Sequence, residues 1–149
     1  MIKDLILKKC FTDFQDAWQL RSTNEVMESM IFERFINYVI LSQDELGTFV
    51  GRPELLEFCC TGGGADAKLD GVGIKINGQL VSSIDDINQI IENSKKIEVE
   101  FFVIQSKEAT DFDSAAFSTF GVGVKNFFSD PLLPENEKIK LIRELISVR

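Results

Sequence analysis

The sequence predicts an α/β domain in which helices flank a small mixed β-sheet. Two observations carry this prediction. Hydrophobic residues make up 44% of the 149 residues, which is enough for one domain with a sizeable core. Segments with helical periodicity occupy both ends of the chain, and short apolar runs interrupted by one helical segment lie between them. We expect a single domain over residues 1–149, with a helical lead-in over 1–22, a closing helix over 135–149, and further domains of a longer protein after it.

The N-terminal part of the chain is expected to be helical. Residues 11–20 mix aromatic and aliphatic side chains with acids, which predicts a short amphipathic helix. Ser22 is followed by Glu25 three residues later in the capping-box pattern, so a second helix should begin there and run to about Ser42. Apolar residues occupy nearly every face of this second helix, which predicts burial on several sides.

The middle of the chain carries strand and turn signals. Residues 55–60 could begin a strand, and the glycine-rich run TGGGAD follows as a loop. The run KLDGVGIKI predicts a second strand. The dipeptide Asn77-Gly78 then predicts a two-residue hairpin turn into a third strand, QLVSS.

One helix is expected between this hairpin and the last strand. Ser83 should cap it, with Asp85 and Asp86 at its positive end. Lys95 and Lys96 suit its C-terminal end. Its apolar face consists of Ile84, Ile87, Ile90 and Ile91.

The last strand is expected over residues 97–105, and two helices follow it. The run TDFD should cap a helix with a phenylalanine-rich face over 117–128. Gly121 and Gly123 in this helix indicate close packing on the sheet. Pro131 and Pro134 should end it, and residues 135–147 form the closing amphipathic helix.

Charge and composition exclude several functions. The net charge of −8 counts against nucleic acid as a partner of this segment alone, although other domains could provide the affinity for nucleic acid. The chain has no His and no CxxC spacing, which excludes a structural zinc site and a Ser-His triad within it. Its three Cys cannot all pair, which favours a reduced, cytoplasmic protein. No signal peptide and no run of membrane-spanning length are present, so we expect no membrane partner.

Four polar residues form the candidate site. Asp70 stands at the start of a predicted strand, after the glycine-rich loop, and Gln105 and Lys107 end another. Residues i and i+2 of a strand point to the same side, so Gln105 and Lys107 should leave the sheet together, with Ser106 facing the opposite layer. Glu33 lies with Asn37 on an otherwise apolar side of its helix, where an acid is costly to bury unless it is paired or faces a site.

These residues could build a metal site if Asp70 lies on the strand next to Gln105. The carboxylate, the amide oxygen, the backbone carbonyl of Ser106 and water form the oxygen-rich shell that suits Mg²⁺ or Mn²⁺. A metal there would polarise a phosphate and lower the pKa of a bound water. Lys107 could orient that water or stabilise the charge that develops on the phosphate.

The order of these motifs resembles a known family. GGGADAKLDGVGI followed by FFVIQSK resembles the core of the PD-(D/E)xK nuclease superfamily, in particular the Mrr-like branch in which Gln replaces the second acid. Over about residues 25–130 the chain resembles the N-terminal region of the AIPR family, the abortive-infection phage-resistance proteins. The resemblance implies a restriction-endonuclease-like core that acts on DNA with Mg²⁺ in phage defence.

The resemblance also implies a role for each site residue. Asp70 matches the metal-binding aspartate, Gln105 the second metal-side residue, and Lys107 the catalytic lysine. Glu33 matches a glutamate that some members place on the first helix, and Asp66 in the glycine loop is a further acid near the metal. This chain departs from the superfamily pattern because Gln105 is neutral, and because a predicted helix is inserted between Asp70 and Gln105.

Two other functions fit the residues. The neutral Gln105 and the acidic net charge fit a nuclease-fold module that only binds a partner or forms a homodimer. The run TGGG could form a nest of backbone N–H groups for a phosphate, although it lacks the ending of a P-loop. Cys59 and Cys60 are interpreted as small buried apolar residues.

Overall fold

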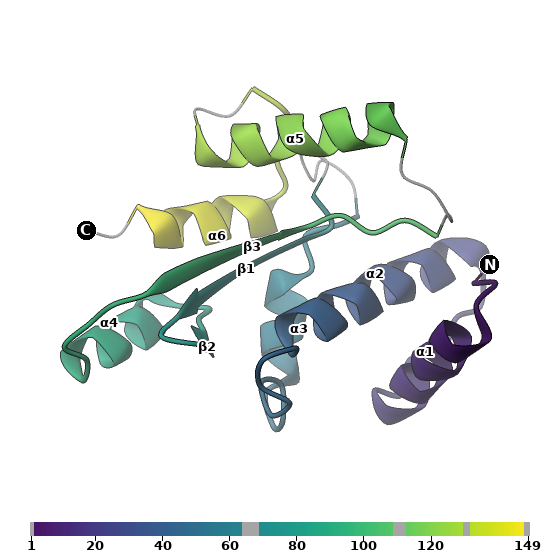
Figure 1. Ribbon diagram of the computed structural model, residues 1–149, viewed down its shortest axis with the longest axis horizontal. Helices are drawn as coiled ribbons and strands as arrows, with labels where there is room; N and C mark the ends of the chain where they lie inside the picture. The colour runs from purple at the N-terminus through teal and green to yellow at the C-terminus, as the bar shows by residue number, and fades with distance from the viewer. Residues whose placement is uncertain (1, 64–68, 109–112, 130–131, 148–149) are drawn as a thin grey trace.

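The computed structural model describes residues 2–63, 69–108, 113–129 and 132–147, and over them it is a mixed α/β domain (Figure 1). Helices α1, α2 and α3 lie on one side of a three-stranded sheet, and α5 and α6 lie on the other (Figure 1). The elements are α1 (Leu5–Ala17), α2 (Glu25–Leu41), α3 (Pro53–Cys59), β1 (Gly71–Ile76), β2 (Gln79–Leu80), α4 (Ile84–Glu92), β3 (Val99–Ile104), α5 (Ser114–Phe128) and α6 (Glu137–Ile146).

The sheet is antiparallel throughout its described strands, so the expectation of a mixed sheet is wrong. The strand order is β2-β1-β3, and β1 pairs with both neighbours in the antiparallel sense. The hairpin at Asn77 and Gly78 is confirmed, with φ values of 49° and 80° that suit a type I′ turn. The strand after it is two residues long, shorter than QLVSS.

The first helices depart from the prediction at their boundaries. Helix α1 begins at Leu5, several residues before the expected start. Helix α2 ends at Leu41, as expected, but its N-cap is Asn24 rather than Ser22. The Asn24 side chain accepts a hydrogen bond from the backbone N–H of Met27 at 2.8 Å, and Asn caps a helix as well as Ser does.

Residues 55–60, expected to begin a strand, belong mostly to helix α3. Pro53 opens this helix at its first turn, where a missing N–H costs nothing. Leu55, Leu56 and Cys59 are its buried residues, and their spacing is helical rather than alternating. Cys60 then leaves the helix and forms an isolated antiparallel bridge with Gly71.

Strand β1 has two different faces, both buried. Val72, Ile74 and Ile76 belong to the core that α4, α5 and α6 cover. Gly71, Gly73 and Lys75 alternate with them and face the side of α2. A Cβ at Gly73 would lie 2.8 Å from Leu41 Cδ2 of α2, so the glycines let this helix approach the sheet closely.

Buried Lys75 completes the α2-facing side of β1. Its side chain is 1% exposed. The ammonium lies 4.0 Å from Asp44 Oδ2, just beyond α2, and 5.0 Å from the centroid of the Phe102 ring. The carboxylate of Asp44 and the face of the Phe102 ring thus both lie near the buried ammonium.

The later helices begin where the sequence predicts. Ser83 caps α4 through Asp86 N–H, and Asp113 caps α5 through Ala116 N–H. Their apolar faces are only partly buried: Ile84, Ile91, Phe117 and Phe128 remain about half exposed or more. Gly123 is buried, but Gly121 has open space around it, so the expected close packing at Gly121 is wrong.

The end of α5 and the closing helix follow the prediction closely. Helix α5 ends at Phe128, before the expected proline stop; Pro131 itself lies outside the described residues. Helix α6 is capped by Asn136, whose side chain accepts a hydrogen bond from Ile139 N–H.

Over the described ranges, no helix is both long enough and apolar enough to span a bilayer.

Candidate functional site

Asp70 joins three parts of the fold. It directly precedes β1, and its backbone N–H donates a 2.9 Å hydrogen bond to the carbonyl of Ile104 at the end of β3. Its own carbonyl accepts a hydrogen bond of 3.1 Å from Thr61 N–H, just after α3. Both the N–H and the carbonyl of Asp70 are therefore held by backbone hydrogen bonds.

The Asp70 carboxylate contacts the residues that follow β3. Its Oδ2 accepts hydrogen bonds from the backbone N–H of Ser106 at 2.8 Å and from the Ser106 hydroxyl at 3.3 Å. The contacts to Ile104 and Ser106 flank Gln105, so Asp70 lies alongside it. The expectation that Asp70 and Gln105 border neighbouring strands is confirmed by the pairing of β1 with β3.

The Ser106 hydroxyl meets the Asp70 carboxylate, and β3 ends two residues before it. That Ser106 faces the layer opposite Gln105 stays a prediction. Gln105 is half-buried beside this contact, and Lys107 is exposed.

Glu33 reaches the same place from α2. An ideal Cβ built on Gly62 would collide with Glu33 Oε2, and Asp70 Oδ1 lies 3.8 Å from the same Cβ position. The two carboxylates thus approach one point from opposite elements, and the missing side chain of Gly62 leaves the space between them. The sequence does not predict that Gly62 leaves space for the Glu33 carboxylate, because nothing in it indicates which residues pack against Gly62.

Asn37 connects the helix of Glu33 to Asp70. It is fully buried, and its Nδ2 donates to the carbonyl of Asp70 at 3.0 Å and to Cys60 Sγ at 3.5 Å. An ideal Cβ on Gly71 would collide with the oxygen of the Asn37 amide. The sequence placed Asn37 on the same side of the helix as Glu33 but assigned it no function.

The Glu33 and Asp70 carboxylates are oxygen donors of the type that a magnesium ion takes. Mg²⁺ takes one or two carboxylates and keeps several waters, and the space beside Gly62 is bordered by Glu33 and Asp70. In the described ranges, no group of three or more acidic, Cys or His side chains is placed to hold a metal. Asp66, the further acid expected from the resemblance, lies outside the described residues.

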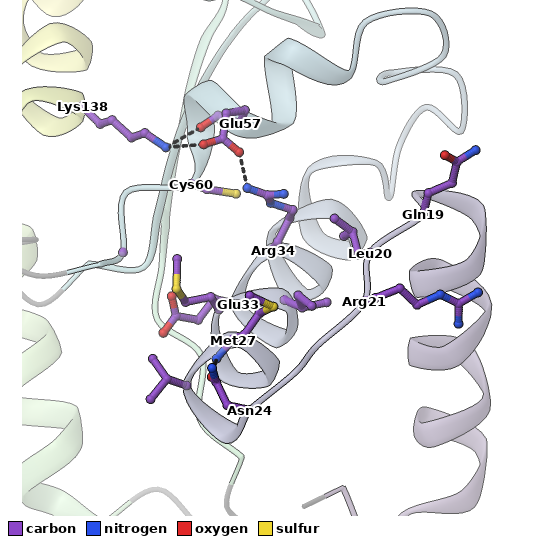
Figure 2. A pocket seen from close by; sticks show the side chains of 14 residues that line it. Gln19, Leu20, Arg21, Asn24, Met27, Glu33, Arg34, Glu57, Cys60 and Lys138 are labelled. Atoms are coloured by element: carbon purple, nitrogen blue, oxygen red, sulfur yellow. Dashed lines mark hydrogen bonds and ion pairs between the residues drawn. The ribbon is translucent and has the colours of Figure 1, made fainter.

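A pocket of about 620 Å³ opens beside Glu33 (Figure 2). One wall is apolar and includes Met27 and Met30 of α2. The other wall holds Glu57, which is ion-paired with Arg34 and, at 2.7 Å, with Lys138 (Figure 2). These pairs connect α2, α3 and α6 around the pocket.

Two groups in this wall have shifted pKa values. Burial alone would raise the pKa of Glu57, but the hydrogen bond from Lys138 and the charge of Arg34 hold it below its ordinary value. Burial raises the pKa of the Cys60 thiol, and the hydrogen bond from Asn37 offsets only part of that effect. The Cys60 thiolate is therefore less populated at a given pH than the thiolate of an exposed cysteine.

Comparison of the chain with protein-family profiles, with curated proteins and with solved structures finds no match. The function is therefore inferred from the geometry of Glu33, Asp70 and the residues after β3.

Proposed function

We propose that the domain is a metal-dependent DNA endonuclease with a restriction-endonuclease-like core, acting in the cytoplasm as the front part of an AIPR-type phage-defence protein. One observation carries the proposal. The carboxylates of Glu33 and Asp70 both lie next to Gly62, and the Asp70 carboxylate accepts hydrogen bonds from Ser106, which follows β3. Two carboxylates close to one point can hold a metal ion that assists phosphodiester hydrolysis, and we propose that Gln105 and Lys107 complete the site.

Each residue has a role in this proposal. Glu33 and Asp70 would hold Mg²⁺ or Mn²⁺, together with the Gln105 amide oxygen, the Ser106 carbonyl and Asp66. When bound, the metal supplies positive charge that polarises a phosphate and lowers the pKa of a water. Ser106 holds the Asp70 carboxylate in one orientation through two hydrogen bonds. Exposed Lys107 would position the attacking water or neutralise charge on the phosphate.

Binding of DNA would depend on more than this site. The net charge of −8 repels a polyanion, and two cations of the neighbouring pocket, Arg34 and Lys138, are paired with Glu57. Further domains of a longer protein are the expected source of DNA affinity.

A second function is favoured by a different observation. Gln105 is neutral, and no three-acid group is present among the residues that the structure describes. A domain with this weakened site could bind a partner or form a homodimer without catalysis. A phosphate-binding role for TGGG is disfavoured, because the Thr61 N–H is donated to Asp70 and the Glu33 carboxylate lies against Gly62.

Plasmid cleavage tests the proposal. Supercoiled DNA is incubated with the purified protein and Mg²⁺ or Mn²⁺, and Asp70→Asn and Lys107→Ala should each lower the rate by about 100-fold or more. The matched controls are Asp85→Asn and Lys95→Ala, which change exposed residues of the same types in and after α4. Cleavage that survives both site substitutions contradicts the site. No cleavage and no metal binding by the unchanged protein supports the non-catalytic module.

A further inference from the structure

Helix α2 is attached to the sheet one turn after Glu33. Residues i and i+4 share a helix face, so Asn37 lies directly beyond Glu33 on the side that faces β1. Asn37 donates a 3.0 Å hydrogen bond to the carbonyl of Asp70. One residue of α2 therefore holds the backbone of the residue that carries the second carboxylate.

The Asn37 amide is retained at a cost to stability. Its side chain is fully buried, and its Oδ1 accepts no hydrogen bond in the described part of the chain. Burying an unsatisfied acceptor is unfavourable, and the two hydrogen bonds from Nδ2 are what this amide provides that an apolar side chain of the same shape would not. A costly polar group next to two convergent carboxylates indicates a role beyond packing.

Gly71 is complementary to Asn37. An ideal Cβ on Gly71 would lie 2.6 Å from Asn37 Cγ and 2.7 Å from Nδ2, far inside contact distance. Because Gly71 directly follows Asp70, the absence of its side chain lets the Asn37 amide reach the Asp70 carbonyl. The helix and the strand thus come close enough for this amide to reach the Asp70 carbonyl.

We propose that Asn37 is a positioning residue that fixes the separation between the Glu33 and Asp70 carboxylates; this role rests on the proposed metal site. Asn37 does not touch the metal space itself. It acts through the backbone of Asp70 and through the position of α2. Outer groups that orient metal ligands commonly change metal affinity by about 10- to 100-fold when they are removed.

Three variants separate positioning from packing. Asn37→Ala leaves a cavity, and Gly71→Ala creates a clash, so each alone should lower the midpoint of thermal unfolding. In the double variant the methyl group introduced at position 71 occupies the space that the amide leaves, and the midpoint should recover. Asn37→Leu provides a second folded variant, because leucine has nearly the shape of asparagine and leaves no unsatisfied acceptor.

Mn²⁺ binding, measured by calorimetry, is the first measurement. The Asn37→Ala/Gly71→Ala double variant and Asn37→Leu should bind Mn²⁺ about tenfold more weakly than the unchanged protein, although they are folded. Asn126→Ala is the matched control. Asn126 is a buried amide of α5 that accepts hydrogen bonds from Leu132 and Leu133, so its loss should lower stability and leave Mn²⁺ affinity unchanged.

A second measurement needs no metal. Glu33→Gln and Asp70→Asn are combined in a double-mutant cycle on the unfolding equilibrium in urea at low salt. Because the two carboxylates are close, the effect of one substitution should depend on the other by about twofold or more. This dependence should fall by half or more when the cycle is repeated in the Asn37→Leu background.

The outcomes distinguish the two proposals. If the unchanged protein binds Mn²⁺ and both Asn37 variants bind it equally well, the role of Asn37 is overturned and the metal site stands. If the unchanged protein binds no Mn²⁺, the proposed function fails, and the urea cycle decides about Asn37. A cycle with no coupling, or with coupling that Asn37→Leu leaves unchanged, overturns the positioning role.

Discussion

Ser106 donates its backbone N–H and its hydroxyl to the same oxygen of the Asp70 carboxylate, at 2.8 and 3.3 Å. The other carboxylate oxygen, Oδ1, lies toward Gly62. Oδ2 is thus held by Ser106, whereas Oδ1 points to the space beside Gly62 that Glu33 also borders. The residues after β3 therefore orient the acid whether or not a metal is bound.

This relationship predicts a small and specific effect of Ser106→Ala. The substitution removes only the longer of the two hydrogen bonds, so unfolding in urea should show a loss of about 0.5–1.5 kcal/mol. Ser118→Ala, at an exposed position of α5, is the control and should stay within about 0.5 kcal/mol of the unchanged protein. Equal effects of the two substitutions would show that the hydroxyl does not hold the carboxylate.

Gly62→Ala should affect the site more than the fold. The new methyl would displace the Glu33 carboxylate, the flexible end of a half-buried side chain, so stability should change little while Mn²⁺ affinity falls by about tenfold or more. Gly121→Ala provides the opposite control. It lies in the interior of α5 with open space around it, and alanine there should stabilise the protein by about 0.5–1 kcal/mol without changing Mn²⁺ affinity.

Local signals explain which elements the sequence predicted well. The hairpin at Asn77 and Gly78 and the cap at Ser83 depend on neighbouring residues alone, and both are where they were expected. The prediction that residues 55–60 could begin a strand is wrong, because the apolar run LLEFCC is too short for periodicity to distinguish a strand from helix α3. Pro53 at the helix start was the signal that would have corrected this.

The sequence likewise predicts one part of the candidate site and not the other. The sequence left open whether Asp70 lies on the strand next to Gln105, and the pairing of β1 with β3 meets that condition. The approach of Glu33 to Gly62 and the hydrogen bond from Asn37 to Asp70 depend on how α2 packs over β1. These two contacts join residues 29 and 33 positions apart, and no short motif encodes them.

The close approach of α2 to the sheet can be tested at Gly73. Its ideal Cβ would lie 2.8 Å from Leu41 Cδ2 and 3.3 Å from Leu80 Cδ1, so Gly73→Ala should destabilise the protein by about 1–3 kcal/mol. In a Leu41→Ala background the same substitution should cost clearly less, because the clashing methyl is gone. An equal cost in both backgrounds would contradict the packing of Leu41 on Gly73.

Thiol labelling tests the environment of the three cysteines. Cys10 is exposed on α1, whereas Cys59 is fully buried, and burial raises the pKa of the Cys59 thiol to about 12. Since the thiolate is the reactive form, a neutral thiol reagent at mildly alkaline pH should modify Cys10 first in the native protein. Cys10→Ser should remove this rapid phase, and denaturation should make Cys59 and Cys60 reactive. Rapid labelling of the Cys10→Ser protein would contradict the burial of Cys59 and the partial burial of Cys60.

The ion pairs of Glu57 predict a component of acid sensitivity. The folded-state pKa of this carboxyl is below its ordinary value of 4.5, so its contribution to stability is present above that pH and is lost as pH falls through the folded pKa. Because the Glu57 side chain is 52% exposed, solvent screens the pairs and the contribution should be about 1 kcal/mol or less. Glu57→Gln should therefore be less stable than the unchanged protein at neutral pH and equally stable in strong acid, as measured by urea unfolding across pH.

Lys138→Met should reproduce part of this difference, and high salt should reduce it. A difference that persists unchanged in strong acid would assign the effect of Glu57→Gln to packing rather than to charge.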